Sequence, residues 1–305
     1  MSSPHVMQVI DSLKIGGAEM LLRELTLGLL EKNFRVTVCY NTSGPLVDSF
    51  KTMDVKLFQL LPKARIDPFL LAQLSTLMRR EKPDLVHTHL FKSDIHGRLA
   101  ARFAGVPVVV STLHNNDVWA RKFPLGQIYG ATSNFTNNLI AVSQEVKQYH
   151  LRYTNVPENK IVIIENGVDL RRFSNLEDST RNKIREEFGI AVDAPLFGII
   201  GRLVPQKDHL LFLKMAFEIL QKMPTARFLV VGDGELRLEL EEEARRMSLL
   251  PSLIFAGIRR DIPEILTAID VLVFSSKWEG LPVTLLEGMA AERPWSQQQL
   301  TGFVM

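Results

Sequence analysis

The sequence has few of the features that would tie a protein to an oxidising compartment, a membrane span or a nucleic acid. It contains a single cysteine, Cys39, so no disulfide can form within the chain, which suits a reducing compartment. Cys39 lies in the alternating pattern of residues 35–40 and is expected to be a small core residue. No apolar run is long enough to span a bilayer. Residues 1–11 also lack the basic start and long apolar segment of a signal peptide.

Charge is also in short supply. The formal net charge is +2, which is too small to indicate a nucleic acid partner. Basic residues are in excess over residues 1–170 and acidic residues over 171–305. A mildly basic first half fits a weak attraction to an anionic lipid surface. We therefore expect a cytoplasmic protein that contacts, at most, the inner face of the plasma membrane.

What the sequence does have is apolar residues (46%) in a chain of 305 residues, enough for two domains. Apolar runs and helical patterns alternate along it. In the first part, we expect a glycine turn at Gly16-Gly17 that opens a helix. The other elements expected there are strands at 5–11, 35–40, 55–60, 84–88, 107–113, 138–142 and 161–164, and helices at 67–82, 92–104, 120–136 and 143–153.

The apolar rhythm stops between Glu165 and Asp178 and resumes at Leu196. We place the linker there and predict domains at 1–170 and 171–305. The elements expected in the second domain are strands at 196–200, 227–231, 252–256 and 270–274, and helices at 206–222, 235–247, 261–268 and 281–291. Strands alternating with helices predict an α/β fold with two doubly wound parallel sheets. Ligands of such folds bind at the carboxyl ends of the strands, so we expect the two domains to face a cleft.

Two glutamates frame the stretch after the last expected strand. Glu279 lies in the loop and Glu287 in the helix, which is expected to start near Leu281 or Pro282. A helix N-terminus after a glycine-bearing loop offers N–H groups to an anion, and carboxylates accept hydrogen bonds from sugar hydroxyls. This pattern suggests a nucleotide-sugar site. An ordinary amphipathic helix with one capping and one solvated glutamate explains the stretch equally well.

Other candidates follow other strands. Gly16-Gly17 allows close approach of the backbone to a ligand, although a plain turn explains the pair as well. Arg202 and Lys207 follow the first strand of the second domain and together can neutralise a diphosphate; two solvated cations are the alternative. Gly232-Asp233-Gly234 starts like a dinucleotide fingerprint, but it lacks the third glycine and is discounted.

Three histidines lie on two neighbouring strands or at their ends. His114 ends the strand at 107–113, at the edge where a ligand is expected, although a lone histidine is more often structural. His87 and His89 share one face of their strand. No cysteine or nearby carboxylate completes a metal set, so a core or hydrogen-bonding role is favoured over zinc.

Five motifs together resemble the retaining glycosyltransferases of family 4, which have the GT-B fold of two facing Rossmann-like domains. The resemblance runs from about Val6 to Arg293. The motifs are Gly16-Gly17-Ala18-Glu19, Glu165-Asn166-Gly167-Val168-Asp169, Gly201-Arg202-Leu203 with Lys207, Val231-Gly232-Asp233-Gly234, and Glu279 with Glu287. Each is modest, but five in this order and spacing are specific.

The resemblance implies an enzyme that transfers a sugar from a nucleotide diphosphate donor with retention, without a metal ion or another cofactor. In the implied site, Glu287 holds the ribose, Glu279 contacts the donor sugar, and backbone N–H groups near Gly280 and Leu281 meet the phosphate or sugar. Arg202 and Lys207 would bind the diphosphate, Gly17 would approach the phosphate, and His114 would lie beside the sugar. Charge on the departing diphosphate would be stabilised by these fixed cations and N–H groups. The leaving phosphate itself can serve as the base.

The implied acceptor is a saccharide or a lipid-linked saccharide, as in polysaccharide or lipopolysaccharide biosynthesis. Trp119-Ala120-Arg121-Lys122-Phe123 mixes aromatic and basic residues, as a lipid headgroup surface does, and Arg79-Arg80-Glu81-Lys82 can assist it. Solvated helix faces are the alternative and are slightly favoured. The sequence does not identify the base or the sugar of the donor.

The chain departs from the family after Pro294. The family continues with a Pro-Val-Val strand and further elements, whereas Trp295 to Met305 show no such pattern. We therefore expect an incomplete second domain, with the strand at 271–274 as an unpaired apolar edge and a tendency to aggregate. Two alternatives to an active transferase remain. One is an inactive remnant that at most binds nucleotide, and the more distant one is a nucleotide-sugar epimerase.

Overall fold

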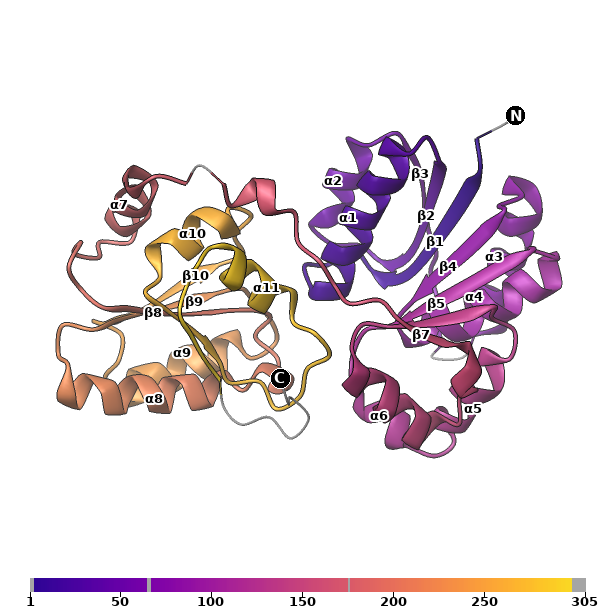
Figure 1. The fold of residues 1–305 in the computed structure, drawn as a ribbon. Coiled ribbons are helices and arrows are strands. Elements are labelled where there is room, and N and C mark those ends of the chain that lie inside the picture. Colours follow the sequence, from indigo (N-terminus) through magenta and orange to yellow (C-terminus); the bar gives the residue numbers. More distant parts are fainter. Residues whose placement is uncertain (1–2, 65–66, 175, 298–305) are drawn as a thin grey trace. The chain divides into compact units, whose positions relative to one another are not determined.

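The computed structural model describes residues 3–64, 67–174 and 176–297, and the chain folds as two compact units (Figure 1). The first unit is Met1–Asn166 and the second is Gly167–Met305. The boundary lies slightly before the predicted division between residues 170 and 171. Val168 explains the difference, because it already packs against a core cluster of the second unit.

The first unit is built on a seven-stranded parallel sheet with the order β3-β2-β1-β4-β5-β6-β7. Its strands are β1 (His5–Ser12), β2 (Arg35–Thr42), β3 (Val55–Gln59), β4 (Leu85–His89), β5 (Val108–Leu113), β6 (Asn138–Ala141) and β7 (Ile161–Ile163). Its α-helices are α1 (Gly17–Glu31), α2 (Leu46–Lys51), α3 (Pro68–Glu81), α4 (Phe91–Ala104), α5 (Leu125–Ser133) and α6 (Gln144–Thr154).

Both faces of this sheet are buried near its centre, so the first six residues of β1 are all buried and its apolar residues stand in adjacent pairs instead of alternating. On one face, Met7 and Val9 pack with leucines of α3, among them Leu74. On the other face, Ile10 packs with Leu22 of α1 and residues of α2. Cys39, the predicted core residue, is fully buried in the first of these clusters.

The second unit is built on a five-stranded parallel sheet with the order β10-β9-β8-β11-β12. Its strands are β8 (Leu196–Ile200), β9 (Arg227–Val231), β10 (Leu253–Gly257), β11 (Val271–Phe274) and β12 (Trp295–Gln297). Its α-helices are α7 (Asp178–Glu187), α8 (His209–Lys222), α9 (Arg237–Arg246), α10 (Ile262–Ala268) and α11 (Val283–Ala290). Helices α8 and α9 cover one face, and α7, α10 and α11 cover the other (Figure 1). Two doubly wound α/β units are thus confirmed.

The prediction that the strand at 271–274 forms an unpaired edge of the second sheet is wrong. β11 pairs with β8 on one side and with β12 on the other, where Leu272 lies opposite Trp295. Trp295 also packs against the core cluster that contains Leu272 and Leu285. The first residues after Pro294 therefore supply the fifth strand that the sequence pattern did not reveal. The basis given for aggregation, an unpaired β11, is absent from the described structure. The rest of the tail, 298–305, lies outside the described residues.

In the predicted linker, the described residues between Glu165 and α7 form a 3₁₀ turn at Leu170–Arg172 and no other helix or strand. Two helices had no counterpart among the predictions, namely α2 and α7. Of the helices in the described ranges, none is both long and apolar enough to cross a bilayer.

Candidate active site

The strands β8 and β11 are parallel neighbours, so the loops that follow them leave the same edge of the second sheet. Hydrogen bonds join the two loops directly. They run from Lys277 N to the Gln206 carbonyl (2.8 Å), from Gln206 Nε2 to the Trp278 carbonyl (2.9 Å), and from Ser275 Oγ to the Lys207 carbonyl (2.7 Å). The two loops therefore form one surface, and six of the predicted site residues lie on it or on the helix that follows it.

An ion pair links the two loops. Lys207 Nζ donates a hydrogen bond to Oε1 of Glu279 over 2.5 Å, and Gln206 Nε2 lies 3.4 Å from the second carboxylate oxygen. Glu279 is buried, and the stem of Lys207 crosses Gly201 so closely that a Cβ at Gly201 would lie 3.3 Å from Cε of the lysine. The predicted diphosphate-binding lysine and the predicted sugar-binding glutamate thus contact each other.

Glu287 lies on α11, and its side chain is buried. The helix begins at Val283 and not at Leu281 or Pro282, because Pro282 has the extended ψ of 122° and serves as the N-cap. Gly280 and Leu281 stand just before this N-terminus, where the N–H groups of the first helical turn have no carbonyl four residues earlier within the helix. Glu287 therefore lies within the helix, shortly after its first residue, as its spacing from Glu279 predicted.

Arg202 follows β8 and is exposed. Its guanidinium makes no hydrogen bond or ion pair with any residue of the described ranges. An exposed guanidinium at the carboxyl end of a central strand suits an external anion.

Gly232 and Gly234 have a packing role that explains their motif. Gly232 has φ of 132°, and a Cβ there would lie 2.0 Å from the carbonyl oxygen of Gly201. A Cβ at Gly234 would lie 2.4 Å from the carbonyl oxygen of Leu203, whose N–H donates to the Asp233 carbonyl. The glycines let the loop after β9 pack against the loop that carries Arg202. The two glycines of the discounted dinucleotide fingerprint thus have a packing role.

In the first unit, Gly17 is the first residue of α1, with Gly16 as the N-cap. Gly17 is exposed, whereas Glu19 in the first turn is buried and accepts a hydrogen bond from Ser12 Oγ at 2.6 Å. This bond ties the helix start to the end of β1. The backbone at Gly17 is therefore exposed, as the predicted close approach of a ligand requires, and the turn that carries it is anchored to β1.

His114 lies just beyond β5, half-buried, and it contacts other histidines. Its Nε2 is 3.0 Å from Nδ1 of His89, and His87 Nε2 is 2.8 Å from Oγ1 of Thr112. Burial lowers the pKa of His114 to about 3 and that of His87 to about 4, and for His114 the neighbouring His87 adds repulsion. The hydrogen-bonding role favoured for His87 and His89 is confirmed, and His114 is a neutral imidazole near pH 7.

A small pocket opens beside His114 in the first unit. Its lining includes Leu90, Asp94, Trp119, Tyr129 and His150. Leu90 has φ of 71°, an uncommon conformation for a residue other than glycine, where the chain turns from β4 into α4.

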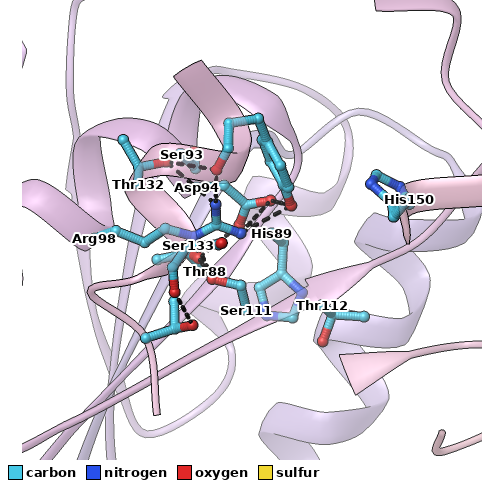
Figure 2. Close-up of polar contacts among 12 residues, drawn as sticks. Thr88, His89, Ser93, Asp94, Arg98, Ser111, Thr112, Thr132, Ser133 and His150 are labelled. Carbon is cyan, nitrogen blue, oxygen red and sulfur yellow. Dashed lines mark hydrogen bonds and ion pairs between the residues drawn. The ribbon is translucent and has the colours of Figure 1, made fainter. Parts of the chain in front are cut away.

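Asp94, which lines this pocket, forms a fully buried ion pair with Arg98 (Figure 2). Asp94 accepts hydrogen bonds from Thr88 Oγ1 and Tyr129 Oη, both at 2.6 Å. Arg98 donates to Ser111 Oγ at 2.9 Å and to Tyr129 Oη at 2.8 Å. Burial outweighs Arg98 and raises the pKa of Asp94 to about 6. Sequence reasoning missed this network, although the spacing of four residues between Asp94 and Arg98 on a helix was a usable signal.

The aromatic and basic stretch at 119–123, predicted as a lipid headgroup surface, has one part that packs inward and one part that is exposed. Trp119 turns inward and packs on Phe91 and Tyr129, with ring centroids 4.5 and 4.6 Å away. Phe123 is 84% exposed, and Lys122 is exposed as well. Part of the stretch is thus available to an external surface, whereas the tryptophan belongs to the pocket wall.

No group of three or more histidine, cysteine, aspartate or glutamate side chains in the described parts of the chain is arranged to hold a metal ion.

The fold recurs in solved structures. The structure superimposes on Anabaena HepE in complex with UDP and glucose with a TM-score of 0.85, at 20% identity, over 98% of this chain and 82% of that one. It also superimposes on WaaG, a glycosyltransferase involved in lipopolysaccharide biosynthesis, with a TM-score of 0.77, at 16% identity, over 98% and 82% of the two chains. The two doubly wound units are therefore the Rossmann-like domains of a GT-B fold.

Sequence comparisons give the family. Residues 15–172 match the model described as Glycosyltransferase Family 4, and residues 194–295 match the one for Glycosyl transferases group 1. The chain is 34% identical over 303 residues to an Escherichia coli UDP-Gal:alpha-D-GlcNAc-diphosphoundecaprenol alpha-1,3-galactosyltransferase, covering 94% of this chain and 77% of that protein. The chain belongs to glycosyltransferase family 4 and is a glycosyltransferase.

Proposed function

We propose that this enzyme transfers a hexose from a UDP-sugar to a saccharide carried on a polyprenyl diphosphate, with retention of the anomeric configuration. The observation that carries the proposal is the 34% identity, over 94% of the chain, to a galactosyltransferase whose name gives such a donor and acceptor. Assembly of a polysaccharide or lipopolysaccharide is the process that consumes products of this kind.

The donor is assigned to the two joined loops of the second domain. Glu287 binds the ribose hydroxyls, while Arg202 and Lys207 bind the diphosphate. Backbone N–H groups near Gly280 and Leu281 add to the phosphate site, and Glu279 contacts the hexose. Support comes from the ion pair of Lys207 with Glu279, which brings a cation and a carboxylate together beside the exposed Arg202.

In the first domain, Gly17 is assigned to the phosphate and His114 to the hexose. The small pocket next to His114 has an aromatic wall, with Trp119 and Tyr129 4.6 Å apart, of the kind on which sugar rings stack. The acceptor's lipid is assigned to a membrane surface touched by Phe123 and Lys122, since one is an exposed aromatic and the other an exposed cation.

The chemical task is to stabilise charge on the departing diphosphate, which fixed cations and helix N–H groups do without reorganisation. We assign the acceptor's proton to an oxygen of the leaving phosphate. Glu279 is not assigned as a nucleophile, because its Oε1 is occupied by Lys207. The proposal assigns no metal ion to the step, so transfer should persist in excess EDTA.

Incubation of the protein with radiolabelled UDP-galactose or UDP-glucose and synthetic GlcNAc-diphosphoundecaprenol tests the proposal. We expect label to move into the lipid fraction, and the anomeric proton coupling of the product to show the configuration of the donor. An inverted product would contradict retention. Binding of UDP with no transfer to any acceptor in a membrane extract would instead favour the inactive remnant.

A further inference from the structure

A line of three hydrogen-bonding side chains runs through the first domain to the candidate site. Gln8 on β1 and His89 on β4 are both fully buried, and His114 follows β5. Oε1 of Gln8 is 2.9 Å from Nε2 of His89, and Nδ1 of His89 is 3.0 Å from Nε2 of His114. Both ring nitrogens of His89 therefore have a partner, which fixes the orientation of this ring.

The direction of these bonds determines where the protons are. A carbonyl oxygen only accepts, so Nε2 of His89 carries the proton that it donates to Gln8. A neutral imidazole has one N–H, which leaves Nδ1 of His89 as an acceptor. The proton between the two rings then belongs to Nε2 of His114. As a result, Nδ1 of His114 is the unprotonated nitrogen.

Two observations support this assignment. Burial holds the pKa of His89 well below its usual value and lowers that of His114 to about 3, so both rings are neutral near pH 7 and each has a single N–H. Among the described residues, Nδ1 of His114 has no hydrogen-bond partner, and the half-buried ring lines the small pocket. Nδ1 of His114, a hydrogen-bond acceptor, is therefore available to a ligand.

We propose that Gln8, acting through His89, sets the tautomer of His114 so that its Nδ1 accepts a hydrogen bond from a hydroxyl group of the sugar. Gln8 and His89 are positioning residues, and the relay selects a hydroxyl donor over a phosphate or carboxylate oxygen at this point. The opposite tautomer would present an N–H and favour those anions. The identity of the ligand rests on the proposed function, whereas the tautomer does not.

The experiment compares Gln8→Glu with the unchanged protein by ¹⁵N-detected NMR of the histidine rings near pH 7.5. A carboxylate can only accept, like the amide oxygen, so both proteins should show His114 protonated on Nε2 alone. If Gln8 instead donated its NH₂ to His89, the unchanged protein would show protonation on Nδ1 and the Glu variant would reverse it. Protonation of His114 on Nδ1 in the unchanged protein therefore overturns the relay.

Gln8→Met removes the acceptor, and we expect both tautomers of His114 and a loss of about two- to tenfold in kcat/KM for sugar transfer, the range expected for one neutral hydrogen bond. The matched control is Thr37→Val, which removes the 2.8 Å partner of another buried histidine, His5, in the same sheet. It should leave the His114 signals unchanged. A Gln8→Met spectrum with Nε2 protonation intact would contradict the proposal even where the variant is less stable.

The two levels of the inference fail separately. A reversed or mixed tautomer in the unchanged protein refutes the relay whatever the enzyme transfers. The expected spectra together with unaltered transfer by Gln8→Met would leave the relay in place and refute the contact between His114 and the sugar.

Discussion

Lys207 and Glu279 lie 72 positions apart in the sequence, yet Nζ and Oε1 are 2.5 Å apart where the loops after β8 and β11 meet. The ion pair holds the ammonium group beside the buried carboxylate, and the carbon stem of the lysine lies over Gly201. A bound diphosphate would add two or three negative charges to the same place. Under the proposed assignment to the diphosphate, the lysine is already oriented before the donor arrives, and little side-chain entropy remains to be lost on binding.

Lys207→Ala should weaken the binding of a nucleoside diphosphate far more than that of the nucleoside. A charged hydrogen bond contributes about 1.5–3 kcal/mol, which corresponds to a loss of roughly tenfold or more. Isothermal titration calorimetry with both ligands measures the difference. Lys277→Ala is the control, because this exposed lysine belongs to the neighbouring loop and its ion pair, with Asp208 at 3.6 Å, does not involve Glu279. Unchanged affinity in Lys207→Ala would remove this lysine from the diphosphate site.

Glu287→Gln should reduce donor affinity while the fold stays intact. The amide keeps the shape of the buried side chain but loses the negative charge that strengthens hydrogen bonds from the ribose diol. We expect a loss of about tenfold for UDP and a midpoint of urea unfolding close to that of the unchanged protein. The exposed Glu218→Gln serves as the control. A large loss of stability with normal UDP affinity would make Glu287 a core residue instead.

His209 should make the second domain sensitive to acid. This first residue of α8 is fully buried, neither ring nitrogen has a hydrogen-bond partner among the described residues, and burial with Lys207 nearby lowers its pKa to about 4. The unfolded chain, with a pKa of 6.5, binds the proton more readily. Stability therefore falls as the pH drops from 6.5 towards 4, by up to about 1.4 kcal/mol per pH unit.

Urea unfolding at several pH values tests this prediction in two variants. His209→Leu should remove the slope and raise stability at pH 7.5, since it replaces an unpartnered polar ring by an apolar side chain. His209→Asn should flatten the slope as well, but without stabilisation. A slope that survives in both variants would assign the acid sensitivity to other groups.

Arg98→Met should destabilise the first domain strongly. It leaves the carboxylate of Asp94 buried without its cation, and breaking a buried pair in this way costs about 3–5 kcal/mol. Adding Asp94→Asn should recover part of the loss. Arg102→Met, on the exposed side of the same helix, should change the free energy of unfolding by no more than about 0.5 kcal/mol. A double variant no more stable than Arg98→Met alone would show that packing, and not charge, explains the effect.

The elements that sequence reasoning found are those with strong local patterns. Apolar runs such as Val271–Phe274 predicted strands of both sheets, and the spacing of Glu279 and Glu287 predicted a loop and the helix after it. Helix α7 was missed because its mostly polar turns bury only Ile184 and Arg185, which gives no apolar periodicity. The strand β12 was missed because three residues carry no alternation, and its partner β11 supplies the pairing.

Contacts between residues far apart in the sequence could not be predicted. Gln8 and His89 are 81 positions apart, and only the pairing of β1 with β4 brings them together. A lone glutamine in an apolar strand gives no signal of such a role. The ion pair of Lys207 with Glu279 likewise depends on β8 and β11 being neighbours in the sheet. The order of the strands determines this, and no motif in the sequence reveals it.

The packing of Gly232 and Gly234 against Gly201 and Leu203 restricts how this protein can change. The loop after β8 cannot be lengthened or shifted without separating it from the loop after β9, because the backbones already touch at distances where no Cβ fits. Altered donor preference is therefore expected to arise by exchange of outward side chains such as Arg202, on a backbone path that stays the same. Mutant libraries for changing the donor should vary these outward side chains and leave Gly201, Gly232 and Gly234 unchanged.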